Sequence, residues 1–272
     1  MRTVHIKGAE IPVIGMGTYT IKGSGAAELI AQALEMGYTY LDSAQMYGNE
    51  SDISKGIKLA GAEREDVFVL TKVHPENTYP DKFLESVEES LRNLDLDYVD
   101  LLLIHWPNPK VPVQHAIAEL MKAQEKGYAK FIGVSNFNIS MIKTALEMGA
   151  EIVTNQVEYH CFLNQDKLKH FLQEKGISLT AYSPLGQGMV IGNPVLKEIG
   201  EKYSKTEAQV ALRWLIEQDQ VLAIPRSSSK ERLASNLEVF DFWLSEEDRK
   251  AIDKLRFTNR RMVDWQYSPD WD

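Results

Sequence analysis

Four side chains that can take part in proton transfer follow short apolar runs in the first half of the chain. Asp42 ends "YTYLD", Lys72 lies in "VLTKV", and His105 ends "LLLIH". Tyr47 follows Asp42 by five residues in "DSAQMYGNE". An ion pair of Asp42 and Lys72 beside a phenol would tune a general acid. We expect the ammonium to favour the phenolate and to lower the pKa of Tyr47 from its ordinary value of about 10.

Such a set suits the reduction of a carbonyl group. When a hydride adds to the carbonyl carbon, the oxygen becomes an oxyanion that Tyr47 would protonate. His105 would donate a hydrogen bond to the same oxygen and stabilise the developing charge. Each residue alone is more often structural, since an aspartate after a strand usually belongs to a turn and a lysine is usually solvated. The set indicates function because an acid, a base and an imidazole end successive apolar runs.

The elements that must position these residues are short strands alternating with helices. After an opening hairpin that turns at Gly8, eight runs rich in Val, Ile and Leu alternate with amphipathic stretches. This alternation is typical of βαβ units around a parallel sheet. "PDKFLESVEESLRNL" has a helical apolar stripe, and Thr206 with Gln209 has the pattern of a capping box. The runs span residues 13–18, 38–44, 67–73, 98–106, 129–136, 151–158, 177–183 and 221–227.

Eight such units without a break in composition predict one domain, residues 1–272, folded as a closed (β/α)8 TIM barrel of the α/β class. We expect the N-terminal β-hairpin to close the bottom of the barrel and the C-terminal tail to lie over the active-site face. The carboxyl ends of the strands converge on that face, so residues far apart in sequence would meet there.

An open, doubly wound sheet that binds a dinucleotide is the alternative fold. It would place G-x-G-x-x-G directly after a strand and at the start of a helix. The segment "GMGTYT" has Gly15 and Gly17 but lacks the third glycine, and no helical pattern follows it at once. The sequence therefore favours the barrel.

Composition excludes several classes of partner. The net charge of -9 and the pI of about 5.3 argue against nucleic acid and anionic membranes, which bind basic faces. No apolar signal core or membrane-spanning stretch is evident, so we expect a cytoplasmic protein. A single cysteine, Cys161, and six histidines without HxxxH or HxH spacing predict no metal site.

Several motifs together resemble those of the aldo-keto reductase family, in matching order and spacing over almost the whole chain: "DSAQMYGNE", "LTKV", "LLLIHWP", "GVSNF", "TNQVEYH" and "AYSPL". The resemblance implies a carbonyl reductase that binds NADPH without a Rossmann motif. It implies a catalytic tetrad of Asp42, Tyr47, Lys72 and His105, with Tyr47 as the proton donor. The ending "SPDWD" is most similar to that of the bacterial 2,5-diketo-D-gluconate reductases, which also reduce methylglyoxal.

The same resemblance assigns residues that would hold the cofactor. Tyr182 would stack on the nicotinamide ring, and such stacking contributes a modest energy beyond that of burying the ring. The carboxamide of the nicotinamide would be bound by Ser135, Asn136 and Gln156. Ser183 and Leu185 would hold the pyrophosphate.

The segment "IPRSSSKERLASN" points to a phosphate-binding site on physical grounds. Ser229 has the character of an N-cap, which places Lys230 and Arg232 in a first helical turn, where the helix dipole disfavours cations. Cations in that position suggest an anion opposite them, although a solvated basic turn is the alternative. The group that would hold an adenosine 2'-phosphate, and so favour NADPH, comprises Arg226, Ser227, Ser228, Arg232 and Asn236.

The substrate pocket is expected to be small and polar, because Tyr19 and His74 stand where many family members have larger aromatic residues. Met46 and Trp106 would complete its lining. The aromatic tail "MVDWQYSPDWD" either forms a lid over this pocket or only packs against the barrel. We interpret His160 and Cys161 as ordinary loop residues without a role.

Two other functions stay open. In a lyase of the same fold, Lys72 would form a Schiff base with a carbonyl substrate. A non-catalytic nicotinamide-binding module would keep the fold without turnover, but the intact tetrad favours an enzyme. The expected partner is a small carbonyl compound, and similar proteins suggest a monomer.

Overall fold

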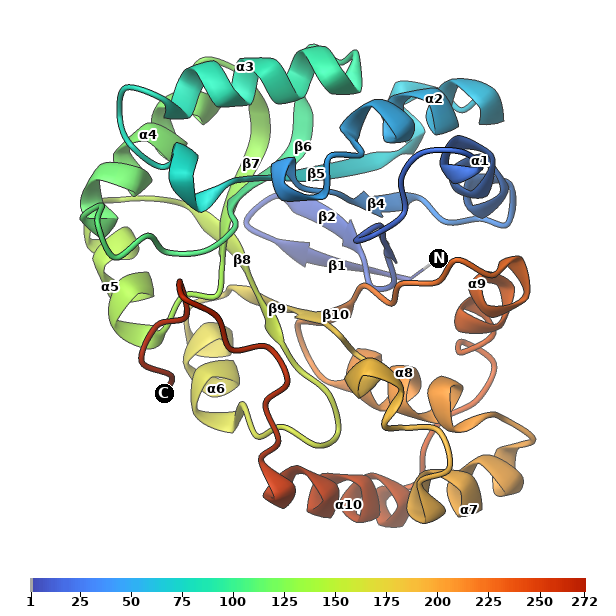
Figure 1. Ribbon diagram of the computed structural model, residues 1–272. Helices are drawn as coiled ribbons and strands as arrows, with labels where there is room; N and C mark the ends of the chain where they lie inside the picture. The colour runs from blue at the N-terminus through green and yellow to red at the C-terminus, as the bar shows by residue number, and fades with distance from the viewer. Residues whose placement is uncertain (1) are drawn as a thin grey trace.

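The computed structural model describes residues 2–272. Eight parallel strands form one sheet, and outer helices alternate with these strands along the chain (Figure 1). Neighbouring strands follow the order β10-β9-β8-β7-β6-β5-β4-β3. Each of the eight predicted runs contains one of them. The strands are β3 (Met16–Gly17), β4 (Tyr40–Asp42), β5 (Phe68–Val73), β6 (Val99–Ile104), β7 (Ala129–Ser135), β8 (Ile152–Glu158), β9 (Ser178–Tyr182) and β10 (Val221–Ala223).

Backbone contacts between the first and last strands close the sheet into a barrel. Gly15 N donates to Ala223 O over 2.9 Å, and Ala223 N donates to Val13 O over 2.9 Å. Gly17 and Arg226 form a parallel bridge. A Cβ at residue 17 would lie 2.7 Å from Ile224 O, so only glycine permits this close approach. The predicted (β/α)8 barrel is confirmed, and the open sheet is excluded.

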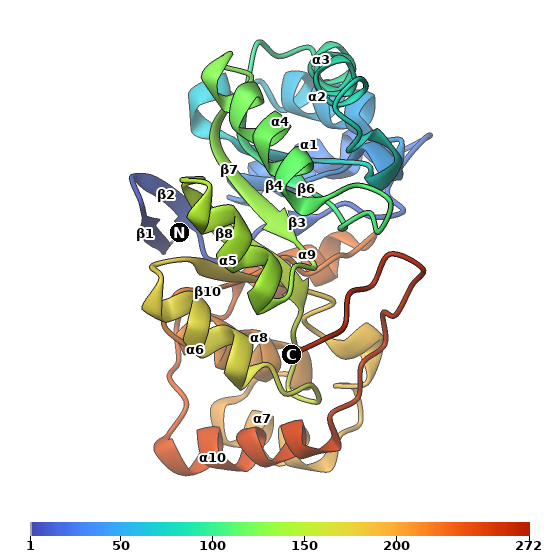
Figure 2. The same ribbon diagram turned by 90° about the vertical axis from the view of Figure 1, so that its left-hand side faces the viewer.

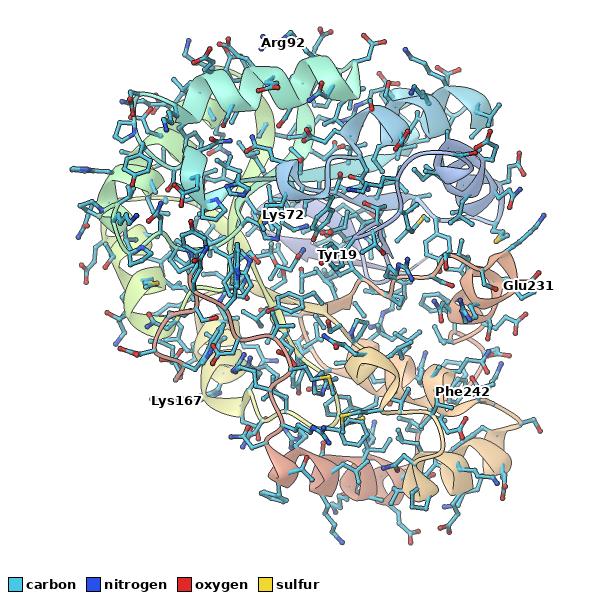
Figure 3. All side chains as sticks on the ribbon, in the orientation of Figure 1. Tyr19, Lys72, Arg92, Lys167, Glu231 and Phe242 are labelled. Atoms are coloured by element: carbon cyan, nitrogen blue, oxygen red, sulfur yellow. The ribbon has the colours of Figure 1, made fainter. Side chains whose placement is uncertain are left out.

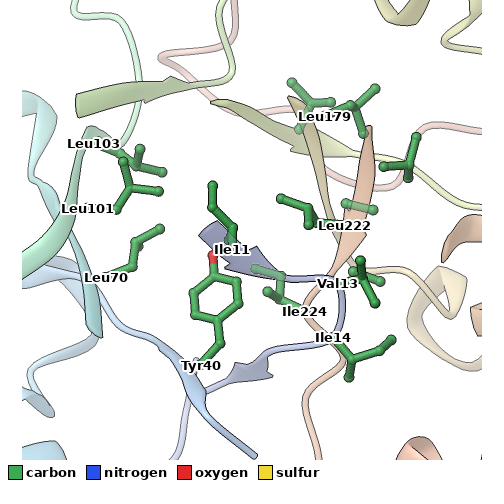
Figure 4. Packing of buried hydrophobic residues seen from close by; sticks show 14 of the residues in the cluster. Ile11, Val13, Ile14, Tyr40, Leu70, Leu101, Leu103, Leu179, Leu222 and Ile224 are labelled. Atoms are coloured by element: carbon green, nitrogen blue, oxygen red, sulfur yellow. The ribbon is translucent and has the colours of Figure 1, made fainter. Parts of the chain in front are cut away.

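The N-terminal hairpin plugs the barrel. Strands β1 (Thr3–Ile6) and β2 (Ala9–Pro12) pair antiparallel through a two-residue turn in which Lys7 and Gly8 both have positive φ, as a type I′ turn requires. Ile11 of β2 is fully buried and lies among Leu101, Leu103 and Leu222 of the barrel strands (Figure 4). The hairpin therefore closes one end of the barrel with apolar side chains, as predicted.

Ten α-helices within residues 2–272 surround the strands (Figures 1 and 2). The apolar stripe of α3 is buried at Phe83, Val87 and Leu91, and the predicted capping box of Thr206 and Gln209 begins α8. None of these helices is long and apolar enough to span a membrane. The helices are α1 (Ala26–Glu35), α2 (Glu50–Ala60), α3 (Phe83–Leu94), α4 (Val113–Glu125), α5 (Ile139–Glu147), α6 (Asp166–Glu174), α7 (Pro194–Tyr203), α8 (Glu207–Glu217), α9 (Lys230–Leu237) and α10 (Glu246–Leu255).

Candidate active site

A buried ion pair lies where β4 and β5 end. Lys72 Nζ is 2.6 Å from Asp42 Oδ1 and 2.8 Å from the carbonyl oxygen of Ser43, and neither charged side chain is reached by solvent. Burial raises the pKa of Asp42 and lowers that of Lys72, and the opposite charge of the partner opposes each shift. Lys72 lies near the centre of the molecule in Figure 3. The pair is thus a fixed electrostatic feature beneath the open face of the barrel.

Tyr47 closes the short 3-10 turn η1 (Gln45–Tyr47), and its hydroxyl lies 3.3 Å from Lys72 Nζ. Desolvation raises the pKa of Tyr47 well above 10, and the negative charge of Asp42 adds to this shift. The expected net lowering of this pKa is wrong, because desolvation of the phenol, together with the charge of Asp42, outweighs the attraction of the Lys72 ammonium for a phenolate. The phenol therefore stays protonated at neutral pH, as a proton donor must.

His105 follows β6 and faces the tyrosine. The two ring centroids lie 5.6 Å apart with an interplanar angle of 79°. Burial, together with the nearby charges of Lys72 and His74, lowers the pKa of His105 well below 6.5, so the imidazole is neutral. Its Nδ1 is buried and has no hydrogen-bond partner among residues 2–272. A neutral ring with an unused nitrogen in this position can donate to, or accept from, a bound small molecule.

A chain of hydrogen bonds connects the ion pair to the residues assigned to the nicotinamide. Gln156 Nε2 donates to Asp42 Oδ2 over 2.7 Å, and Ser135 Oγ donates to the carbonyl of Gln156 over 2.8 Å. Asn136 Nδ2 donates to Ser135 Oγ over 3.0 Å, and Tyr182 OH donates to Asn136 Oδ1 over 2.9 Å. Five residues from four strand ends therefore form one network, which the sequence pattern alone does not reveal.

Ser183 and Leu185 lie in the loop that follows Tyr182, directly before the 3-10 turn η4 (Gly186–Gly188). Ser183 has a φ of 47°, and its carbonyl accepts a hydrogen bond of 2.9 Å from the backbone N–H of Gly186. This compact turn continues from the strand that carries Tyr182. The two residues are thus adjacent to the proposed nicotinamide platform.

Only some of the residues predicted to bind the 2'-phosphate lie together in the structure. Ser229 is the N-cap of α9, and Arg232 Nε donates to Ser227 Oγ over 3.1 Å. Arg226 instead points to the loop after β3, where its Nη2 donates to Thr20 Oγ1 over 2.6 Å. Its Nε donates to the carbonyl of Tyr19 over 3.1 Å. Ser228 directly precedes this N-cap, and Asn236, one turn after Arg232, is buried beside Tyr38.

The mouth of the site is aromatic. The ring of Tyr19 lies 5.2 Å from that of Tyr47, and Met46 is half-buried in the same turn as Tyr47. Trp106, directly after His105, is nearly buried because Trp265 and Trp271 of the tail pack edge-on against it at 5.8 and 6.4 Å between ring centroids. The tail therefore both packs on the barrel and lies beside the catalytic candidates.

His74 forms another part of this rim through the turn that follows β5. Its Nδ1 accepts a 3.0 Å hydrogen bond from Glu76 N, and the Glu76 carboxylate accepts one from Tyr267 OH of the tail. The tail is therefore attached to the loop that carries His74. This attachment joins two segments that are 191 residues apart.

The start of the tail is held by Glu158, a residue outside the predicted site, and His160 contacts this glutamate. Glu158, at the end of β8, is fully buried and accepts 2.8 Å hydrogen bonds from the backbone N–H groups of Met262 and Val263. His160 Nε2 lies 2.9 Å from the same carboxylate. His160 lies in the loop after β8, as predicted, and its ring is fully buried against this carboxylate. The feature of the sequence that points to this contact is a charged residue, Glu158, at the end of a strand whose other residues are uncharged.

Cys161 is buried, and burial raises the pKa of its thiol to about 12, so the thiolate is disfavoured. Within residues 2–272, no three side chains among His, Cys, Asp and Glu gather closely enough to hold a metal ion.

A protonated phenol, a neutral imidazole and a buried lysine–aspartate pair converge at the open face of a (β/α)8 barrel. Side chains of these kinds, arranged in this way, can orient a carbonyl oxygen and supply a proton to it. The family model described as "Aldo/keto reductase family" matches residues 13–256. The chain belongs to the aldo-keto reductase family.

Several similar proteins are named for the reduction of small carbonyl compounds. The chain is 37% identical to methylglyoxal reductase DkgB of Escherichia coli O157:H7 over 266 residues, which cover 96% of this chain and 99% of the relative. It is 40% identical to glyoxal reductase of Bacillus subtilis (strain 168) over 256 residues, covering 93% and 92%. A solved structure provisionally named 2,5-diketo-D-gluconic acid reductase B superposes with a TM-score of 0.97 at 42% identity, covering 100% of this chain and 98% of that one.

Proposed function

We propose that this protein uses NADPH to reduce small aldehydes, ketones and dicarbonyls to alcohols, with Tyr47 as the proton donor. The observation that carries the proposal is the 3.3 Å separation between the Tyr47 hydroxyl and Lys72 Nζ, at a site where the phenol stays protonated. A general acid must hold its proton until the substrate oxygen becomes basic, and Tyr47 meets this requirement.

Each of the four side chains has a different role in the reduction of the substrate carbonyl. Tyr47 holds the proton that the oxygen takes up as the carbonyl is reduced. The neutral ring of His105, edge-on to Tyr47 at 5.6 Å, donates a hydrogen bond that orients the same oxygen. Lys72 stabilises the phenolate left behind, because its ammonium is the nearest positive charge, and Asp42 keeps that ammonium in place.

The residues beside the tetrad fit a nicotinamide nucleotide. Tyr182 presents a half-buried ring at the open face, with its hydroxyl fixed by Asn136. Arg232 lies in the first turn of α9, where a phosphate would find charge-assisted partners, whereas Arg226 is held by Tyr19 and Thr20. When bound, the nicotinamide supplies the hydride. Arg232 supports NADPH over NADH, because only NADPH carries the 2'-phosphate.

A small dicarbonyl is the proposed substrate class. The relatives are named for methylglyoxal, glyoxal and 2,5-diketo-D-gluconic acid, all of which carry adjacent or nearby carbonyl oxygens. Tyr19, Trp106 and Trp265 place aromatic rings around the proposed site, and we expect this rim to favour compact substrates.

The Schiff-base lyase receives no support from the geometry. The lysine of a Schiff-base enzyme must offer a neutral amine with a free lone pair. Lys72 Nζ instead lies within 2.6, 2.8 and 3.3 Å of three oxygens, those of Asp42, Ser43 and Tyr47. This arrangement suits a three-donor ammonium and leaves no direction for nucleophilic attack.

The decisive experiment is NADPH oxidation by the purified protein, followed at 340 nm with methylglyoxal, 2,5-diketo-D-gluconate and a simple aldehyde. We expect turnover that prefers NADPH to NADH and that falls by about 10²- to 10⁴-fold in Tyr47→Phe. The matched control, Tyr19→Phe, removes a hydroxyl from the neighbouring ring and should keep most of the activity. NADPH binding, read from tryptophan quenching, without turnover of any carbonyl would instead indicate a binding module.

The proposal also places the protein in the cytoplasm as a monomer of 30.9 kDa. Size-exclusion chromatography with light scattering measures the mass in solution directly.

A further inference from the structure

Gln45 opens the turn that ends at Tyr47, and its side-chain amide reaches two other elements of the barrel. Its Oε1 accepts hydrogen bonds from His74 N over 2.7 Å and from Asn77 Nδ2 over 3.0 Å. His74 directly follows β5, the strand that carries Lys72. Through its oxygen, the Gln45 amide therefore connects the turn that carries Tyr47 to the residue that follows the strand of Lys72.

The donor half of the amide faces helix α3. Gln45 Nε2 donates to the carbonyl of Ser86 over 3.0 Å and to Ser90 Oγ over 3.1 Å, and Ser86 Oγ lies 3.2 Å away. Both serines are buried. One half-buried amide therefore holds together the tyrosine turn, the loop after β5 and the helix that covers them.

The flanks of the turn are anchored separately. Ser43 N donates to Leu70 O of β5 over 2.9 Å, and Asn49 Nδ2 donates to Thr18 O and to Ile21 O. These anchors fix where the turn begins and ends, whereas the Gln45 amide holds the segment between them. The 3.3 Å approach of Tyr47 to Lys72 depends on that segment.

The loop held by Gln45 also reaches the tail, because Glu76 within it accepts a hydrogen bond from Tyr267. We propose that Gln45 is a positioning residue for carbonyl reduction, which sets the Tyr47 hydroxyl against Lys72 and fixes the His74–Asn77 side of the substrate pocket. This inference rests on the proposed function. Gln45 itself touches neither substrate nor cofactor in this role.

Gln45→Met tests the proposal, because it keeps the length of the side chain and removes every hydrogen bond of the amide. We expect kcat to fall at least tenfold, while the Kd of NADPH changes less than twofold and the melting temperature drops by only a few degrees. Gln45→Glu keeps an acceptor for His74 N and Asn77 Nδ2, so it should recover most of the lost rate. A wild-type kcat in Gln45→Met, or a loss that Gln45→Glu does not relieve at all, would overturn the proposal.

Single-partner variants separate positioning from folding. Asn77→Ala removes one donor to Oε1 and should lower kcat severalfold, whereas Ser90→Ala removes one partner on α3 and should leave kcat within twofold. A larger loss of kcat in Ser90→Ala than in Asn77→Ala would also contradict the proposal. These variants keep Gln45 in place and serve if Gln45→Met does not fold.

A titration of Tyr47 distinguishes failure of this inference from failure of the proposed function. The NMR signal of ¹³Cζ-labelled Tyr47 reports its ionisation without any turnover. In the wild type the phenol should remain protonated at pH 10, whereas in Gln45→Met the turn should open to water and the phenol should ionise at lower pH. An unchanged titration rejects the positioning role whether or not the protein reduces carbonyls.

Discussion

Gln156 Nε2 donates to Oδ2 of Asp42 over 2.7 Å, across the barrel from β8 to β4 and over a separation of 114 residues. Lys72 occupies the other oxygen of the same carboxylate at 2.6 Å. Both oxygens of a fully buried carboxylate are thus satisfied, one by a charge and one by an amide. Gln156, assigned by family resemblance to the nicotinamide, also stabilises the ion pair beside Tyr47.

Removing the Gln156 amide should lower both the free energy of unfolding and kcat. Gln156→Leu leaves a buried carboxylate oxygen without its donor, and such a loss costs at least about 1–3 kcal/mol. We expect the free energy of unfolding in urea to fall by that amount and kcat to fall with it, because Asp42 no longer holds Lys72 in one position. Gln173→Leu is the control, since its amide donates only to the exposed carbonyl of Asp219. Equal losses in the two variants would contradict this assignment.

Acid should destabilise the protein through His105. Its pKa is well below 6.5 in the folded chain, so between that value and 6.5 the unfolded chain takes up a proton that the folded chain refuses. The stability from the neutral ring is therefore complete above about pH 6.5 and is lost as the pH falls, by up to about 1.4 kcal/mol per pH unit.

Urea denaturation of the wild type and of His105→Gln at pH 5, 6 and 7 measures this contribution. The variant carries no titrating group at this position, so its stability should decline less steeply from pH 7 to pH 5. His170→Gln, on the exposed face of α6, should decline as the wild type does. Parallel curves for the wild type and His105→Gln would show that the buried imidazole does not resist protonation.

Arg232 should carry the preference for the phosphorylated cofactor. Charge-assisted hydrogen bonds typically contribute about 1.5–3 kcal/mol, so Arg232→Ala should raise the Kd of NADPH roughly 10- to 100-fold. The Kd of NADH should stay nearly unchanged, because NADH has no 2'-phosphate. Fluorescence titrations with both nucleotides give the ratio, and Lys230→Ala, which removes another exposed cation from the same turn, is the matched control. A similar loss for both nucleotides would place Arg232 elsewhere than at the 2'-phosphate.

The barrel, and the convergence of Asp42, Lys72 and His105 on one face of it, can be predicted from the sequence because their signals are local. Each strand is a short apolar run, and these three residues lie at or beside the ends of such runs. The direction of the pKa shift of Tyr47 cannot be predicted in this way. It depends on how completely the folded chain excludes water from the phenol, and no single motif encodes that environment.

The anchoring residues escape prediction for a different reason. Gln45 and Glu158 bind backbone N–H groups of distant segments, and a backbone donor has no signature in the sequence. Met262 is 104 residues from Glu158, so only the folded chain shows that the two meet. Residues of this kind are found by asking where each buried polar atom of the structure has its partner.

Glu158 supplies the last prediction, because its carboxylate holds the start of the tail by two backbone N–H groups at once. Glu158→Gln keeps the size of the side chain, but its amide nitrogen would face one of these donors instead of accepting from it. We expect the tail to detach in part, so that proteolysis at residues 262–272 becomes severalfold faster and KM for a small aldehyde rises more than kcat changes. Mass spectrometry of the digest locates the cut, and Glu174→Gln on the surface of α6 is the control for a lost charge. Unchanged cleavage and unchanged KM in Glu158→Gln would mean that the contacts of Trp265, Tyr267 and Trp271 hold the tail without the carboxylate.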